Sequence, residues 1–223
     1  MPVAAIVQAR TGSTRLPGKV LRDVAGKPLL AYVLERLERA ALIDNVVVAT
    51  SDDPADDALA AFPGVECYRG SLDDVAGRIL GAATSRGVDA FVRISGDSPL
   101  LDQSLVDRAV ALLDDADLVT NVHPRTFPRG QSVEAFRTEA FARGYARMTD
   151  PSDLEHVTPF FYRHEDEFRI APFTHDPDLS KLRLVVDTER DLADFAEIVA
   201  AMERPHWDYG LDEVLELQRA CVR

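Results

Sequence analysis

The sequence predicts an α/β protein of three layers, in which a mainly parallel central sheet is covered by helices on both faces. Short apolar runs alternate along the chain with longer amphipathic segments. This alternation is typical of βαβ crossovers, which bring parallel strands side by side. The chain has 223 residues, of which 46% are hydrophobic, enough for one domain with a full core. We therefore expect a single domain over residues 1–223.

The first predicted unit is strand, helix, strand. Residues 3–8 (VAAIVQ) are apolar along most of their length, as is typical of a strand buried on both faces. In residues 28–42 the apolar positions recur at helical spacing, which predicts an amphipathic helix. Its expected solvent-facing residues are Glu35, Arg36, Glu38 and Arg39. Residues 45–50 (NVVVAT) predict a second buried strand.

The same alternation continues through the middle of the chain. Residues 51–61 begin with a serine that can cap a helix, and the predicted helix ends before a Pro-Gly break. A short strand is predicted at 65–68 and a helix at 71–86. The apolar run at 90–94 (AFVRI) predicts the next strand, and residues 102–113 the next helix.

The last part of the chain interrupts the alternation and then resumes it. A strand is predicted at 117–121, but residues 123–170 are rich in Arg, His, Pro and aromatic residues. We interpret this segment as an inserted arm that covers a site. The sheet is expected to resume at 182–186 (LRLVV), followed by helices at 189–202 and 211–221.

Charge and composition exclude several classes of protein. The formal net charge is −13, which disfavours binding to a nucleic-acid backbone. No apolar run approaches the roughly 20 residues that a membrane span needs, so we expect a soluble, cytoplasmic protein. Cys67 and Cys221 have neither metal-ligand spacing nor partner histidines, so we expect neither a disulfide framework nor a zinc site.

The loop after the first predicted strand has the composition of a phosphate-binding site. Ligands of open parallel sheets bind beyond the carboxyl ends of the strands, where this loop is expected to lie. Its glycines allow close approach, its hydroxyl groups donate hydrogen bonds, and its cations neutralise phosphate charge. The candidate residues are Ala9, Arg10, Gly12, Ser13, Arg15 and Lys19. The spacing fits neither a Walker A motif nor a dinucleotide fingerprint, and the alternative is a solvated loop paired with surface carboxylates.

Two predicted strands end in an aspartate. Gly96 and Asp97 follow the strand at 90–94, and Asp187 follows the strand at 182–186. Mg²⁺ is commonly held by one or two carboxylates together with substrate phosphates, so both aspartates are candidate Mg²⁺ ligands. The structural alternatives are a turn residue for Asp97 and a helix cap near Asp187.

Taken together, these segments resemble a known family. QARTGSTRLPGKVL, YRGSLDDVAGR, VRISGDSPLLD, FPRGQSVEAF, EHVTPFFY and LVVDTERDL occur in the order seen in the CMP-sugar synthetases. The chain is most similar to the spore-coat-polysaccharide cytidylyltransferase-like branch, and more distantly to acylneuraminate and 3-deoxy-manno-octulosonate cytidylyltransferases. The resemblance covers residues 6–192.

This resemblance implies a nucleotidyltransferase fold of the glycosyltransferase-A type, CTP as donor, an acidic sugar as acceptor, Mg²⁺ and a homodimer. It implies triphosphate binding by the basic loop and metal binding by the two aspartates. The cytosine and ribose would lie near Ser71, Asp74 and Arg78. Four further residues would face the sugar or the partner subunit, namely Gln131, Glu134, Glu155 and His156. Ser132 is a departure, because the branch commonly has an aspartate at this position.

The sequence therefore predicts a cytidylyltransferase that transfers CMP from CTP to a sugar acid or similar hydroxyl-bearing acceptor and releases pyrophosphate. Arg10, Lys19, Asp97 and Asp187 are the predicted catalytic residues, acting by positioning and charge stabilisation. Two alternatives stay open. One is a glycosyltransferase that uses a nucleotide-sugar on the same type of sheet, and the other is a non-catalytic nucleotide-binding subunit.

Overall fold

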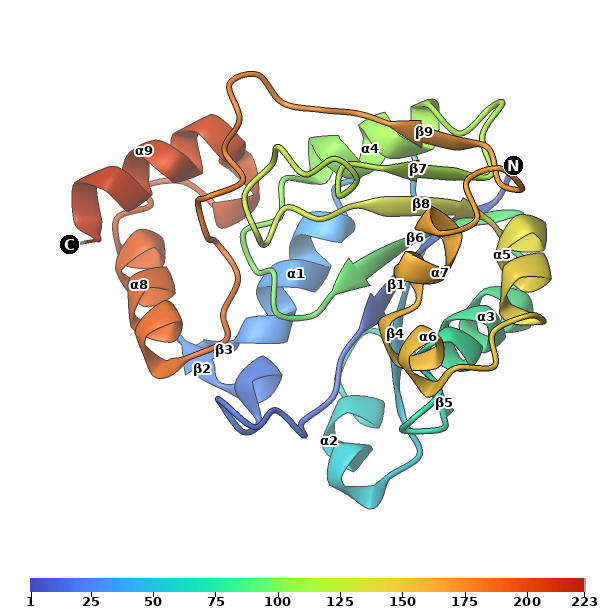
Figure 1. Ribbon diagram of the computed structural model, residues 1–223. Helices are drawn as coiled ribbons and strands as arrows, with labels where there is room; N and C mark the ends of the chain where they lie inside the picture. Colours follow the sequence, from blue (N-terminus) through green and yellow to red (C-terminus); the bar gives the residue numbers. More distant parts are fainter. Residues whose placement is uncertain (223) are drawn as a thin grey trace.

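The apolar runs form a seven-stranded sheet in the computed structural model, which describes residues 1–222 (Figure 1). The strand order is β5-β4-β1-β6-β8-β7-β9, and within this sheet only β8 is antiparallel to its neighbours. The sheet strands are β1 (Val3–Gln8), β4 (Asn45–Ser51), β5 (Glu66–Gly70), β6 (Ala90–Ser95), β7 (Leu118–Thr120), β8 (Glu134–Arg137) and β9 (Ile170–Pro172). A separate two-stranded hairpin pairs β2 (Asp23–Val24) with β3 (Lys27–Pro28). The predicted, mainly parallel α/β fold is confirmed.

Helices cover both faces of the sheet, which gives the predicted three layers (Figure 1). Alternate side chains of β1 belong to two separate apolar cores, because successive residues of a strand point to opposite faces. One core is closed by α1 (Leu29–Leu37), α4 (Gln103–Ala111), α8 (Glu189–Ala200) and α9 (Leu211–Cys221). The other is closed by α3 (Val75–Ser85), α5 (Thr138–Tyr145), α6 (Pro151–His156) and α7 (Thr158–Tyr162). The predicted helix at 51–61 is a 3₁₀ turn followed by the short α2 (Asp57–Ala60).

The segment predicted as an inserted arm contributes a strand to the middle of the sheet. β8 lies between β6 and β7 and pairs with both. The apolar pattern of this strand is interrupted by Glu134, which is buried because Arg93 of β6 neutralises it across the strand pair. A charged residue at a buried position hid the strand from a prediction based on hydrophobicity. The rest of the segment forms α5, α6 and α7, which cover one face.

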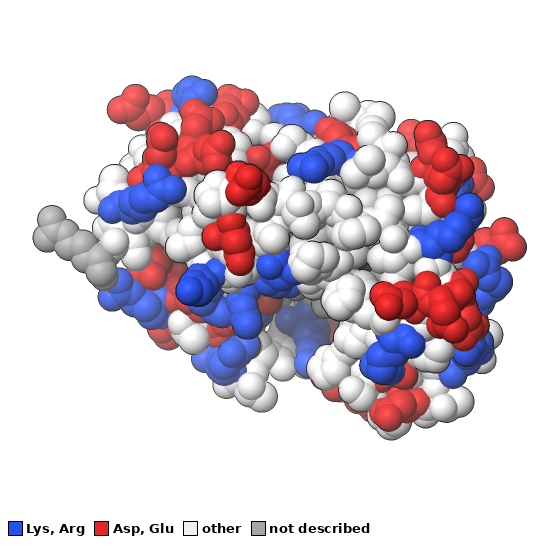
Figure 2. All heavy atoms as spheres, turned by 45° about the horizontal axis from the view of Figure 1, so that its top comes forward, with Lys and Arg blue, Asp and Glu red and all other residues white. Residues whose placement is uncertain are grey.

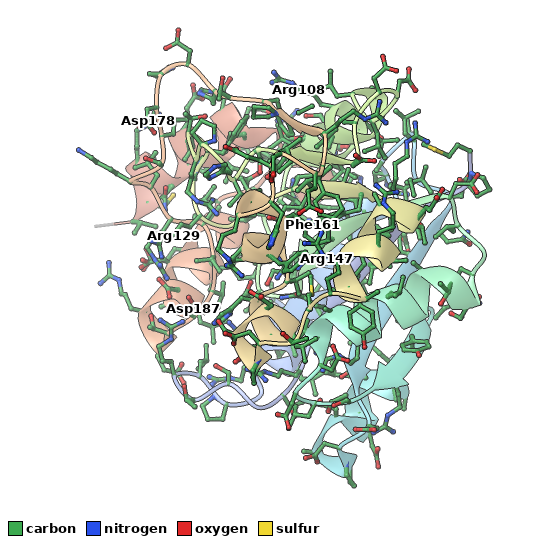
Figure 3. All side chains as sticks on the ribbon, turned by 45° about the vertical axis from the view of Figure 1, so that its right-hand side comes forward. Arg108, Arg129, Arg147, Phe161, Asp178 and Asp187 are labelled. Carbon is green, nitrogen blue, oxygen red and sulfur yellow. The ribbon has the colours of Figure 1, made fainter. Side chains whose placement is uncertain are left out.

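The predicted strand at 182–186 is wrong, since this segment is extended but makes only an isolated bridge, between Arg183 and Arg129. Its backbone bonds go to loops: Leu184 N donates to Arg129 O at 2.7 Å, and Val186 N donates to Asp97 O at 2.9 Å. Figure 3 shows Arg129 and Asp187 on the same side of the molecule, along this segment. Its apolar residues Leu184 and Val186 are buried in the core that α8 and α9 help to close.

The approach of this segment to the sheet depends on Gly130. Its φ is +98°, and a Cβ there would lie 2.6 Å from the carbonyl carbon of Leu184 and 2.7 Å from the nitrogen of Val185. Both atoms belong to the backbone and cannot swing aside as a side-chain tip can. Gly130 thus allows the segment that ends at Asp187 to pack directly on the loop before β8.

We expect Gly130→Ala to lower the free energy of unfolding by about 2 to 3 kcal/mol through strain and the backbone clash. For a chain of this length that corresponds to a melting temperature lower by about 4 to 12 °C, which differential scanning calorimetry would measure. Gly64→Ala is the matched control, because Gly64 also has a positive φ of +76° but open space around its Cβ position. Equal losses in the two variants would contradict the close approach at Gly130.

The position of Arg36 differs from the predicted one, in which this side of α1 faces solvent. It was expected on the solvent face but is fully buried, and its guanidinium donates to the carbonyl oxygens of Leu101, His206 and Tyr209. Burial lowers the pKa of Arg36 to about 10. These bonds tie α1 to the chain around α4 and α9, so this arginine holds three distant segments together.

None of the helices within residues 1–222 combines the length and apolar character needed to cross a lipid bilayer. Both cysteines are free thiols.

Candidate active site

A cavity of about 370 Å³ lies at the carboxyl ends of β1 and β6, beside the loop that follows β1. Five cationic side chains and three carboxylates line it, in a protein whose net charge is −13. Figure 2 shows Lys and Arg side chains gathered around a hollow in the lower middle of the face drawn there. The charged lining residues are Arg10, Arg15, Lys19, Arg78, Arg93, Asp97, Glu155 and Asp187. The cavity therefore combines the local positive charge and the carboxylates that a metal-assisted phosphate site requires.

The loop after β1 is held in a closed turn. Gly18 N and Ser13 N both donate to Thr11 O, at 2.9 and 2.8 Å, and Leu16 is buried in the core. The side chain and the backbone nitrogen of Thr11 both donate to buried Asp56, at 2.6 and 2.7 Å. Burial alone would raise the pKa of Asp56, but the hydrogen bonds it accepts hold that pKa below its usual value. Asp56 was not among the predicted site residues, since its role depends on the folding of η2 (Pro54–Asp56) beside the loop.

Lys19 lies between the two predicted aspartates. Its Nζ is 2.6 Å from Asp97 Oδ2 and 2.7 Å from Asp187 Oδ1. The three side chains are 11 to 19% exposed, so the ion pairs are well shielded from water. Residues far apart in sequence thus converge on one cationic centre flanked by two carboxylates.

Two arginines also lie beside the Asp187 carboxylate. Arg15 and Arg183 lie 3.0 and 3.3 Å from its Oδ2. Burial raises the pKa of Asp187, but the hydrogen bond and charge of Lys19, together with Arg15, outweigh burial and lower it below its usual value. The capping box expected next to it is present, but it uses Thr188 and Asp191, which leaves the Asp187 carboxylate directed at the cations.

The end of α6 forms the opposite wall of the cavity. Glu155 and His156 line it, and Glu155 lies 3.7 Å from Arg10 of the basic loop. The residue that follows this helix, Val157, is buried and has a φ of +68°, a strained value for a β-branched residue. The packing of Val157 in the core therefore fixes the position of the two preceding polar residues at the rim.

The predicted residues of the basic loop, with Gly96 and Arg78, all line this cavity. Arg78 is buried and donates to the carbonyl oxygens of Ser71 and Leu72, at 2.5 and 3.0 Å. A Cβ at Gly96 would lie 3.0 Å from that of Ala9, so this glycine allows the loops after β1 and β6 to approach closely.

Four predicted residues do not line this cavity within the described chain, and three of them, Gln131, Asp74 and Ser71, line neither it nor the smaller cavity described below. Gln131 is fully buried, and its amide bonds to Asp102 N and to the carbonyl oxygen of Leu100, so it is a structural residue. Asp74 caps α3 by accepting from Gly77 N at 2.6 Å, and its other oxygen accepts from Tyr145. Ser71 is exposed outside the cavity lining. The sequence could not show that backbone groups already bond to the side chains of Gln131 and Asp74.

Glu134 lies in a second, smaller cavity of about 180 Å³ that shares lining residues with the first. Its carboxylate accepts from Arg93, Thr158 and Tyr162, at 2.6, 2.8 and 2.7 Å. Burial and the Glu134 charge raise the pKa of Tyr162 above its usual value, so its hydroxyl stays a donor. Sequence reasoning did not assign several other residues that line these cavities, namely Gln8, Thr14, Val20, Val75, Arg93, Ser95, Val122 and Arg125. Ser132, noted above as a departure from the branch, also lines the second cavity.

Comparison with known proteins identifies the family. The family model described as cytidylyltransferase matches residues 4–220. The spore coat polysaccharide biosynthesis protein SpsF of Bacillus subtilis is 31% identical over 225 residues, covering 95% of this chain and 92% of that protein. The 3-deoxy-manno-octulosonate cytidylyltransferase of Geobacter sulfurreducens is 41% identical over 114 residues, covering 51% of this chain and 46% of that protein. A solved cytidylyltransferase structure from Leptospira borgpetersenii has a TM-score of 0.92 at 31% identity, covering 99% of this chain and 94% of that one.

The fold and the matched family define an enzyme of the nucleotidyltransferase class. The chain belongs to the cytidylyltransferase family, as its motifs suggested.

Proposed function

We propose that the protein transfers CMP from CTP to a hydroxyl group of a small acceptor of the sugar-acid kind. The acceptor hydroxyl would give its proton to solvent as its oxygen bonds to the α-phosphorus of CTP. The bond from that phosphorus to the oxygen bridging to the β-phosphorus would break at the same time, so that pyrophosphate leaves with the electron pair. The observation that carries this proposal is the convergence of Lys19, Asp97 and Asp187 inside a cation-lined cavity at the carboxyl edge of the sheet.

The chain's own residues would act through charge and position. Arg10, Arg15 and Lys19 come from one closed loop, so their charges can be directed together at a triphosphate, which would compete with their present carboxylate partners. Glu155 and His156 face that loop from α6 and would bound the other side of the cavity. The second cavity adjoins the first and would take the acceptor.

The donor set fits Mg²⁺. Two carboxylates flank one point, which the amine of Lys19 occupies, so the ion would take the place of that amine. Mg²⁺ suits such a set because it keeps several waters and takes its remaining ligands from substrate phosphates. We propose Asp97 and Asp187 as its protein ligands, and the bound ion would neutralise charge on the phosphates during transfer. The family resemblance also leads us to propose a homodimer.

The test is incubation of the purified protein with each of four nucleoside triphosphates, Mg²⁺ and a panel of sugar acids. We expect CMP adducts by mass spectrometry, with equimolar pyrophosphate, and with CTP preferred over the other three triphosphates. Tight CTP binding without any adduct would contradict catalysis and favour a non-catalytic nucleotide-binding subunit. Glycosyl transfer from a nucleotide-sugar without pyrophosphate release would instead favour a glycosyltransferase.

A further inference from the structure

The second cavity contains a cation that the proposed reaction has not used. Its lining is Gln8, Arg93, Ser95, Val122, Arg125, Ser132 and Glu134, and the first three of these also line the larger cavity. The two cavities therefore adjoin. With a volume of about 180 Å³, the second is too small for a nucleotide but large enough for part of a small acceptor.

The charges in this cavity do not balance. The only carboxylate in its lining is Glu134, which is 5% exposed and already accepts from Arg93, Thr158 and Tyr162. Arg93 and Glu134 therefore neutralise each other as an ion pair. The charge of Arg125 is left over.

Arg125 is bound to the protein through one side of its guanidinium only. Its Nη2 donates to Ser132 Oγ at 3.1 Å. Its Nη1 is buried, and no acceptor for it is present in the part of the chain that the structure describes. Burial lowers the pKa of Arg125 below its usual value, although the nearby charge of Glu134 acts to raise it. A buried donor of a charged group without a partner is unfavourable, so the site is arranged to receive an acceptor atom from elsewhere.

We propose that Arg125 and Ser132 form a subsite that binds an acidic group, a carboxylate or a phosphate, on the acceptor molecule. A guanidinium binds such groups with two parallel hydrogen bonds, and Nη1 offers the free donor. The hydroxyl of Ser132 accepts from Arg125 through a lone pair and keeps its own hydrogen to donate to the same anion. This inference rests on the proposed function, which it extends by assigning residues that select acidic acceptors.

The neutral hydroxyl of Ser132 is the feature that keeps this subsite open to an anion. Ser132→Asp would place a carboxylate beside Arg125 and supply an internal counter-ion, so an external anion would be displaced. Ser132→Asn is the matched control, because it has the shape of aspartate without its charge. Arg125→Gln removes the cation itself and is the second, independent variant.

The experiment is isothermal titration calorimetry at fixed ionic strength, with CTP present throughout so that the larger cavity is filled. Inorganic phosphate and glucuronate are the probes that distinguish the two anion chemistries, and glucose is the neutral comparison. We expect at least one anion to bind the wild-type protein and Ser132→Asn, with affinity lowered about tenfold or more in Ser132→Asp and Arg125→Gln. Glucose should not discriminate among the four proteins. Melting temperatures confirm that each variant is folded.

Three outcomes would overturn the inference: no anion binds the CTP-filled wild-type protein, Ser132→Asp binds anions as well as Ser132→Asn, or Arg125→Gln binds them as well as the wild type. These failures are distinct from failure of the proposed function. The latter would appear as absence of CMP transfer to any acceptor, whereas failure of the subsite inference alone would leave CTP binding and CMP transfer by the wild-type protein intact.

Discussion

Replacing Lys19 with alanine is expected to lower turnover by about 10²- to 10³-fold while the protein stays folded. Lys19 is the cation closest to both Asp97 and Asp187 and lies within the basic loop, which is proposed to bind the triphosphate. Its loss would therefore remove a fixed charge where phosphate charge develops. The effect should fall mainly on kcat, because a preorganised charge contributes most in the transition state. Initial rates of pyrophosphate release at saturating CTP would measure it.

Arg22→Ala is the matched control for Lys19→Ala. Arg22 follows the same loop, but it makes an exposed ion pair with Glu189 outside the cavity lining. Exposed pairs contribute little, so this variant should retain turnover close to that of the wild type. If Lys19→Ala also retained normal turnover with a native melting temperature, the assignment of the loop as the triphosphate site would be wrong.

Asp97→Asn should reduce turnover by about 10²-fold or more, with little change in shape. The substitution keeps the size of the side chain but removes one of the two negative charges that flank Lys19 Nζ. It would weaken both the placement of the lysine and the proposed Mg²⁺ site. Turnover as a function of Mg²⁺ concentration would measure the loss, and we expect a higher Mg²⁺ requirement as well as a lower maximal rate.

Asp102→Asn is the comparison for this variant. Asp102 is also an aspartate and lies five residues further along the chain, but it caps α4 and accepts from Ser104 N and Leu211 N, at 2.9 and 2.8 Å. Its replacement should alter stability without altering the Mg²⁺ requirement.

A double variant of Lys19 and Asp97 should lose less turnover than the product of the single losses, because the two groups are in direct contact. Independent, multiplicative losses would show that they act at separate places.

The candidate site was the most predictable part of the molecule, because its signal is local. The basic loop directly follows the clearest buried strand, and Asp97 directly follows another, so the rule that ligands bind at the carboxyl edge was sufficient to bring them together. Asp187 was placed correctly beside them, although the strand predicted before it does not form.

What could not be predicted depends on pairing between distant residues. Glu134 and Arg36 are charged residues that look solvent-exposed in sequence, yet an arginine of β6 neutralises the first and backbone carbonyls from distant segments accept from the second. Gln131 was expected to face the sugar or the partner subunit, but its amide is bonded to the loop before α4. No sequence pattern indicates the free Nη1 donor of Arg125. It is recognised only because the described residues place no acceptor beside it.

The antiparallel direction of β8 has a consequence for how this enzyme can diversify. Because β8 runs opposite to β6 and β7, the connection from Thr120 to Glu134 returns to the same sheet edge that carries the basic loop. Two separate segments of the chain, the basic loop and residues 121–133, thus lie at the same edge of the sheet, on either side of β6. Under the proposed function, substitutions in residues 121–133 would change which acceptor is selected without altering the loop proposed to bind the nucleotide.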